Sequence, residues 1–188
     1  MTPEEISHTL QEMFGAAVEI PAPGSWQVET DKFRLLVLLS EDQSWLRVLL
    51  PIAPVSEAQP FLEQLMEANF DDTLETRYAL HQGVLWGVFQ HSRSSLILAD
   101  FSAALSKLLS LHERRLSDSF NRLVEDRIRQ IVRTAKLQGQ SLEATLQTLE
   151  RFYQEGLMGD MQQGASSREA TLAAWRYQLE RLWSEEEP

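Results

Sequence analysis

The stretch Leu62–Leu80, LEQLMEANFDDTLETRYAL, changes from helical to extended character within one acidic corner. Apolar residues at helical spacing open the stretch, which predicts a short amphipathic helix. Asn69 can adopt the left-handed conformation that ends a helix, and the Asp71-Asp72 pair favours a turn. Extended residues follow the corner. Helices and strands are therefore mixed along the chain, and we expect the corner to be a scaffold feature of an α+β fold.

Segments on both sides of this corner predict a five-stranded antiparallel sheet. Trp26–Thr30 alternates like an edge strand, and the Pro21-Ala22-Pro23-Gly24 cluster before it predicts a loop. Phe33–Leu39 is continuously apolar after Arg34, as expected of a strand that is covered on both faces or lies centrally. Gly87 indicates close packing or a bulge. The expected strands are Trp26–Thr30, Phe33–Leu39, Trp45–Ile52, Arg77–Gln82 and Val84–His91.

Helix-start signals predict where the sheet-covering helices begin. Thr2-Pro3-Glu4-Glu5 combines a capping hydroxyl, a proline at the first helical position and a glutamate three residues after the cap. Ser56-Glu57-Ala58-Gln59 predicts a second capping box. From Asp100 the apolar period is helical and continues to Gly139, with a face that rotates gradually. We expect its first half to cover the sheet and its second half to meet the C-terminal helices or a second copy of the chain.

The C-terminal part predicts a helical hairpin. Ser141 opens one helix, and Gly156–Gly164 predicts a flexible linker. Ser166–Glu169 is a third capping box, which predicts a last helix. Its tryptophans, Trp175 and Trp183, fit either a core position or an interface, where tryptophan is enriched.

Composition limits the possible chemistry of the chain. Its 188 residues contain 43% hydrophobic residues and no cysteine, which excludes disulfides, thiol catalysis and thiolate metal sites. The net charge is -11, and a chain of this charge is generally repelled by nucleic acid and anionic lipid. No basic region precedes an apolar run at the N-terminus, and no apolar stretch is long enough to span a bilayer. We therefore expect a cytoplasmic protein.

Two long stretches resemble the type III secretion chaperone-like family, which includes the bacterial YbjN-type domains and uncharacterised cyanobacterial members. LRVLLPIAPVSEAQPFLEQLMEAN is similar to that family's third strand, proline-marked exit and short helix. TRYALHQGVLWGVFQHSRSSLILADFSAALSKLL is similar to its following hairpin and last helix. The resemblance spans roughly Pro3 to Leu111. It implies a dimeric, non-enzymatic binding domain at residues 1–112, in the order α-β-β-β-α-β-β-α, and leaves residues 113–188 as a helical extension.

Effector-binding residues in this family are not fixed by a motif, so none is transferred to this chain. The residues themselves also predict no catalytic, cofactor or metal site. Glu4, His8 and Glu12 share a helix face and have a spacing that can hold a metal, but exposed charge pairing explains the spacing better. No serine lies in a nucleophile elbow, and GLMGDMQQG lacks the lysine and hydroxyl residue of a phosphate-binding loop.

One basic stripe is the candidate partner-binding feature. Arg115, Arg122, Arg129 and Lys136 repeat every seven residues, and Arg133 lies beside them. A functional interpretation is an electrostatic dock for an acidic protein segment or for nucleic acid. The interpretation we favour is a solvated helix face that pairs with nearby Glu and Asp. Nucleic acid is the weaker partner, because no aromatic residue interleaves the stripe.

The function predicted from the sequence is protein binding, as a chaperone-like or adaptor homodimer with an unidentified client. The first alternative is a regulatory module that binds nucleic acid or a ligand through the basic stripe. The second is an enzyme of unrecognised type, which would need a deep polar pocket.

Overall fold

The computed structural model describes residues 1–154 and 176–186, and it divides the chain into two compact units. Unit 1 is Met1–Phe120 and unit 2 is Asn121–Pro188. The expected linker Gly156–Gly164, the capping box Ser166–Glu169 and Trp175 lie outside the described residues.

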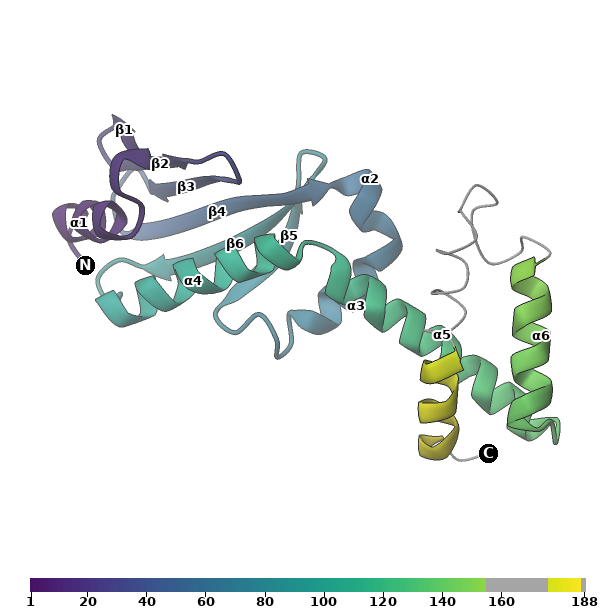
Figure 1. Ribbon diagram of the computed structural model, residues 1–188. Helices are drawn as coiled ribbons and strands as arrows, with labels where there is room; N and C mark the ends of the chain where they lie inside the picture. Colours follow the sequence, from purple (N-terminus) through teal and green to yellow (C-terminus); the bar gives the residue numbers. More distant parts are fainter. Residues whose placement is uncertain (155–175, 187–188) are drawn as a thin grey trace. The chain divides into compact units, whose positions relative to one another are not determined.

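Unit 1 is built on a six-stranded antiparallel sheet in the order β1-β2-β3-β4-β6-β5 (Figure 1). The strands are β1 (Val18–Ala22), β2 (Ser25–Glu29), β3 (Arg34–Leu39), β4 (Trp45–Pro54), β5 (Thr76–His81) and β6 (Val84–Ser92). The helices are α1 (Pro3–Phe14), η1 (Gly15–Ala17), α2 (Val55–Ala58), η2 (Gln59–Phe61), α3 (Leu62–Ala68) and α4 (Leu98–Arg114). The α+β class is confirmed, but the expected count of five strands is wrong.

The additional strand is β1, in the segment that was expected to be a loop. Val18 pairs with Val28, and Ala22 pairs with Ser25 across a turn in which Gly24 has φ 75°. Pro21 has no N–H to donate to a neighbouring strand, and an edge strand tolerates that loss. The proline- and glycine-rich cluster therefore predicted a loop where the chain forms the edge strand β1. With β1 at the edge, β2 is an internal strand and not the expected edge strand.

One face of the sheet is covered by α1 and α4, which lie on the same side of it (Figure 1). Thr2 caps α1 with the predicted capping box, because its hydroxyl accepts from the Glu5 N–H while the Glu5 side chain accepts from the Thr2 N–H. The helices and the covered face share one core of buried side chains. Its largest members are Ile6, Leu10, Trp26, Leu35, Leu46, Leu50, Phe89, Phe101, Leu105 and Leu108.

Gly87 confirms the expectation of close packing. A Cβ at this position would lie 3.0 Å from Leu108 Cδ2 and 3.4 Å from Ile52 Cδ1. Glycine therefore lets α4 approach β6 closely. The β5–β6 hairpin around Gly83 is also as predicted, with Gln82 at φ 49° and Gly83 at φ 76°.

The helix before the corner, and the corner itself, each differ from the prediction in one detail. Pro54, not Ser56, precedes the first helical residue, and no side chain caps α2, so the predicted Ser56 capping box is wrong. Asn69 is right-handed at φ -66° rather than left-handed. Its side chain instead binds the next strand: Oδ1 accepts from the Tyr78 N–H at 2.7 Å, and Nδ2 donates to the Tyr78 carbonyl at 3.2 Å.

The long helix expected from Asp100 to Gly139 is two helices, α4 and α5 (Ser117–Leu137). Arg115 interrupts it with φ 49°, and the Ser117 hydroxyl donates to the Arg114 carbonyl at 2.6 Å. The first half covers the sheet, as predicted. The apolar period alone did not reveal the break, because apolar residues continue on both sides of it.

Unit 2 contains the remainder of α5, α6 (Leu142–Gln154) and helical residues 176–185. Ser141 caps α6 as predicted, since its hydroxyl oxygen accepts from the Ala144 N–H at 3.2 Å. The second half of the apolar face therefore meets C-terminal helical residues. The buried cluster of this unit is Ile128, Val132, Leu179 and Leu182, with Val124, Ile131, Leu142, Leu146 and Trp183 packed against it.

Candidate partner-binding surfaces

The face of the sheet opposite α1 and α4, called here the outer face, carries rows of apolar side chains. Strand alternation places every second residue of a strand on this face, and the strand register aligns those residues into rows. The central row joins Leu36, Leu49 and Val88. A second row joins Pro51, Trp86 and Ala79. The outer face is therefore apolar in its middle, where a solvated sheet face would be polar.

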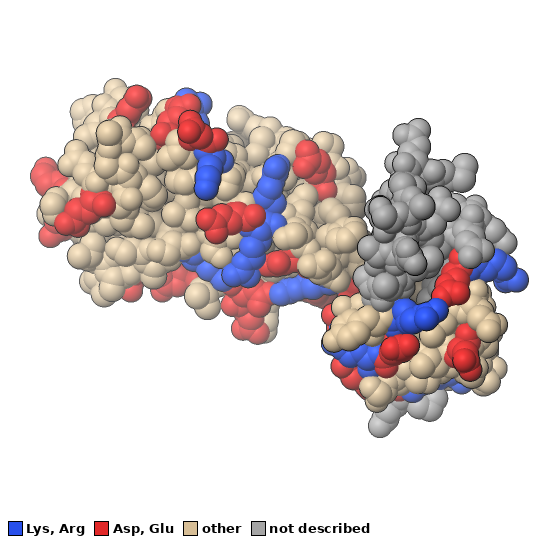
Figure 2. Space-filling view, viewed as in Figure 1, with Lys and Arg blue, Asp and Glu red and all other residues tan. Residues whose placement is uncertain are grey.

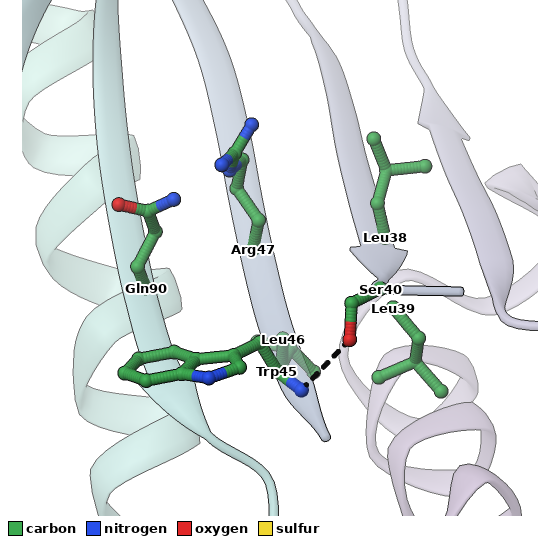
Figure 3. Close-up of a pocket in the computed structure, with 7 residues that line it drawn as sticks. All are labelled: Leu38, Leu39, Ser40, Trp45, Leu46, Arg47 and Gln90. Carbon is green, nitrogen blue, oxygen red and sulfur yellow. Dashed lines mark hydrogen bonds between the residues drawn. The ribbon is translucent and has the colours of Figure 1, made fainter. Parts of the chain in front are cut away.

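A pocket of about 540 Å³ lies where the outer face meets the β3–β4 turn. Leu38, Trp45, Arg47 and Gln90 come from the outer face, and the strand register aligns three of them as Leu38, Arg47 and Gln90. Figure 3 shows those three side chains rising in the same direction, with the Trp45 indole lying across one end. The full lining is Leu38, Leu39, Ser40, Trp45, Leu46, Arg47 and Gln90.

The β3–β4 turn fixes the end of this pocket. The Ser40 hydroxyl accepts from the Trp45 N–H at 3.0 Å and donates to Asp42 Oδ1 at 2.5 Å. Ser44 adds hydroxyl and backbone hydrogen bonds to the same carboxylate. These bonds, led by the one from Ser40, lower the pKa of Asp42 to about 2. The Asp42 charge is thus held within its own turn.

The arginines of the outer face, Arg34, Arg47 and Arg77, lie on β3, β4 and β5, whereas its carboxylates lie on β1 and β2. Arg47 and Arg77 arise from β4 and β5, and Arg77 Nη2 donates to Gln90 Oε1. The carboxylates of this face, Glu19 and Glu29, lie on the first two strands. Figure 2 shows acidic side chains scattered over the drawn side of unit 1, where Lys and Arg form a narrower band. Arg47 and Arg77 are therefore separated from the carboxylates on β1 and β2 by at least one strand.

The predicted basic stripe is largely engaged within the chain. Arg129 contacts Glu125 at 2.8 Å, Glu185 at 3.0 Å and Glu186 at 2.7 Å. Arg133 contacts Glu186 at 2.6 Å. Hydrogen bonds from Arg133 and Arg129 lower the pKa of Glu186, and those from Glu186 and Glu125 raise the pKa of Arg129. These pairs match the interpretation we favoured, a helix face that pairs with nearby acids.

The other stripe residues are placed differently. Lys136 donates to the Glu186 carbonyl at 2.6 Å and lies 5.4 Å from the centre of the Trp183 ring, which belongs to the core of unit 2. Arg115 lies in unit 1 at the helix break, 3.9 Å from Glu57. Arg122 is exposed on α5. The seven-residue spacing does not make one continuous face, because the helix breaks at Arg115.

The histidines occupy structural positions. His8 is exposed and lies 3.3 Å from Glu12, which fits charge pairing on the helix surface. His112 is placed between two backbone carbonyl oxygens, those of Pro51 at 2.9 Å and Lys32 at 3.1 Å. Within the described residues, no group of three His, Asp or Glu side chains is arranged to hold a metal ion.

Sequence reasoning missed the outer face. The signal was present in Phe33–Leu39, whose continuous apolar run fits a central strand. β3 is central, but Leu36 and Leu38 face outward, away from α1 and α4. No helix among the described residues combines the length and apolar content needed to cross a bilayer.

Comparisons with known proteins concern part of the chain. No protein-family model and no curated protein matches it. Two solved structures are similar to it. The HopA1-SchA chaperone-effector complex gives a TM-score of 0.46 at 12% identity, covering 57% of this chain and 87% of the other. The ExsC-ExsE complex gives 0.45 at 18% identity, covering 59% of this chain and 90% of the other.

Proposed function

We propose that this chain is a non-enzymatic protein-binding module, chaperone-like or adaptor in type, that acts as a homodimer. The observation that carries the proposal is the outer face, where apolar rows and a pocket are accessible on the side of the sheet opposite α1 and α4. Leu36, Leu49 and Trp86 are half-buried, and Trp45 beside them is 55% exposed. Apolar surface that is left partly accessible in this way marks interaction sites on soluble proteins.

The chemistry of the pocket favours binding over catalysis. Its lining contains leucines, a tryptophan, a serine, an arginine and a glutamine, with neither an acid nor a histidine to act as a general base. The Ser40 hydroxyl is hydrogen-bonded to Asp42 and to the Trp45 N–H within a turn, and among the described residues it makes no hydrogen bond to a histidine or lysine that would activate it. The pocket offers shape, apolar contact and a positive charge, which are the properties of a recognition surface.

Self-association would use a second apolar region of unit 1. Met66, Phe70 and Leu74 lie on α3 and the corner after it, and they are 66%, 88% and 75% exposed. Exposed side chains of this size at one corner are suited to contact with a second copy of the chain. Light scattering after gel filtration should give a dimer mass for the wild type and a monomer mass for Phe70→Glu/Leu74→Glu. A monomeric wild type at micromolar concentration would remove the dimer from the proposal.

Affinity capture from native extract tests the binding function itself. Three baits are compared: the wild type, an outer-face variant, Leu36→Ser/Leu49→Ser, and a stripe variant, Arg115→Glu/Arg122→Glu. We expect a stoichiometric protein partner that the outer-face variant loses and the stripe variant keeps. Loss in the stripe variant alone would place the contact on the basic residues. Recovery of nucleic acid in place of protein, with release by salt, would favour the regulatory alternative.

A further inference from the structure

We propose that the pocket at Leu38, Trp45 and Arg47 recognises an acidic residue next to an apolar anchor in an extended segment of the partner protein. The apolar side chain would enter the pocket, and Arg47 would bind the adjacent carboxylate. This inference rests on the proposed protein-binding function and names the chemical class of partner that the function requires.

The charge of Arg47 favours an acidic partner. Residues 1–100 hold only 5 Lys and Arg against 15 Asp and Glu, so every cation in this region has many possible acidic partners. Arg34 pairs with Glu29, and Arg93 donates to the carbonyls of Gln43 and Met1. Within the described part of the chain, the Arg47 side chain makes no hydrogen bond or ion pair. An exposed arginine without a carboxylate, in so acidic a region, is available to bind one from another molecule.

The position of Arg47 in the sheet places a second hydrogen-bond donor, Gln90, beside it. Arg47 arises near the start of β4, beside the β3–β4 turn, and is aligned with Leu38 on one side and Gln90 on the other. Gln90 accepts from Arg77, which fixes its amide, and Figure 3 shows its amide nitrogen on the side of Arg47. A carboxylate above this row can therefore accept from both Arg47 and Gln90. Two donors fixed by neighbouring strands form a recognition site, whereas a single mobile arginine does not.

An apolar wall lies beside these donors in the same pocket. Leu38, Leu46 and the Trp45 indole line the same pocket, and Trp45 is 55% exposed. Its volume of about 540 Å³ falls within the range of roughly 300–1,000 Å³ that is usual for ligand sites. A bound side chain would bury Trp45, and tryptophans that are buried at interfaces are often among the residues that contribute most of the binding energy. The pocket therefore selects an apolar side chain and a carboxylate together.

Selection from a displayed library of random peptides, about a dozen residues long, tests the proposal on the full-length chain. Wild type, Arg47→Gln and Arg34→Gln are used as targets. Arg34 is the matched control, because it is an exposed outer-face arginine that already pairs with Glu29. We expect wild type and Arg34→Gln to enrich peptides in which Asp or Glu adjoins an apolar residue, and Arg47→Gln to enrich none of them.

The enriched peptide is then measured by fluorescence anisotropy against its Glu-to-Gln counterpart. Loss of one charge-assisted hydrogen-bonded pair should weaken binding to the wild type by about tenfold or more. Arg47→Gln should bind both peptides alike, and Arg47→Lys should retain only part of the preference, because it keeps the charge without the guanidinium fork. Leu38→Ser should weaken both peptides equally. Circular dichroism confirms that each variant is folded.

Three results would overturn the inference. They are enrichment without acidic residues, the same enrichment on Arg47→Gln as on the wild type, and no enrichment on the wild type. Each is distinct from failure of the proposed function. A partner captured from native extract and retained by Arg47→Gln would leave protein binding standing while the contact at this pocket is rejected.

Discussion

Replacing Asn69 with alanine is expected to destabilise unit 1 by about 1–3 kcal/mol. The Asn69 side chain makes two hydrogen bonds to the backbone of Tyr78, at 2.7 Å and 3.2 Å, and it is half-buried at the end of α3. A hydrogen bond contributes about 0.5–1.5 kcal/mol net, and two such bonds are lost together. Water replaces them only in part, because the corner limits access to this backbone.

Two variants refine the test. Asn69→Asp keeps an acceptor for the Tyr78 N–H but places a second carboxylate oxygen against the Tyr78 carbonyl, so its stability relative to Asn69→Ala should rise when the introduced carboxylate is protonated and can donate to that carbonyl. Glu67→Gln is the matched control, since Glu67 is exposed on the same turn and should change stability by less than about 0.5 kcal/mol. Urea denaturation followed by circular dichroism gives the free energy of unfolding. Hydrogen exchange of residues 76–81 assigns the loss to unit 1.

The reasoning fails if Asn69→Ala unfolds within about 0.5 kcal/mol of the wild type. It also fails if the stability of Asn69→Asp relative to Asn69→Ala is the same at neutral pH as at a pH where the introduced carboxylate is protonated. A large loss without faster exchange in residues 76–81 would show that Asn69 acts elsewhere than on β5.

Three further predictions test other features. Gly87→Ala should lower the free energy of unfolding by about 1–3 kcal/mol, because its Cβ would lie 3.0 Å from Leu108 Cδ2, and adding Leu108→Val should cost less than the sum of the two single changes. Hydrogen bonds from Arg133 and Arg129 lower the pKa of Glu186 below its value of about 4.5 in the unfolded chain, so their contribution to the stability of unit 2 is present above that value and is lost as the pH falls through the folded pKa. Thermal stability should therefore decrease as the pH is lowered below about 4.5. Glu186→Gln should flatten this dependence, and an unchanged slope would contradict the role. An NMR titration of Asp42 should give a pKa of about 2, and Ser44→Ala should move it toward 3.8, whereas an unchanged midpoint would exclude this hydrogen bonding as the cause.

Local sequence signals predicted most of the elements of unit 1. The capping box at Thr2, the hairpin around Gly83 and the close packing at Gly87 depend on short-range chemistry that a few residues determine. Strand β1 was missed because Pro21 was taken as a loop signal. Proline excludes a central strand, but sequence alone does not say which strands have a free edge.

The candidate site was not predictable in the same way. The basic stripe was visible as a seven-residue repeat, but its acidic partners Glu185 and Glu186 are more than 50 residues away from Arg129 along the chain. The central part of the outer face is assembled from strands β3, β4 and β6. Whether it can act as a binding surface depends on which side of the sheet the helices cover. Neither Arg47 nor Gln90 belongs to a local motif. Their alignment results from strand register, which follows from the three-dimensional pairing.

The contact of Asn69 with Tyr78 has a consequence for how the sheet can grow. β5 is a terminal strand, and the N–H and carbonyl that Tyr78 directs away from β6 are the groups that an added strand would use. The asparagine amide presents a donor and an acceptor in the same positions, so it takes the place of one residue of a seventh strand. An incoming chain at this point would have to displace it. The acidic corner that carries Asn69 therefore occupies the hydrogen-bonding groups that β-sheet extension would need at Tyr78, which disfavours edge-to-edge polymerisation on this side.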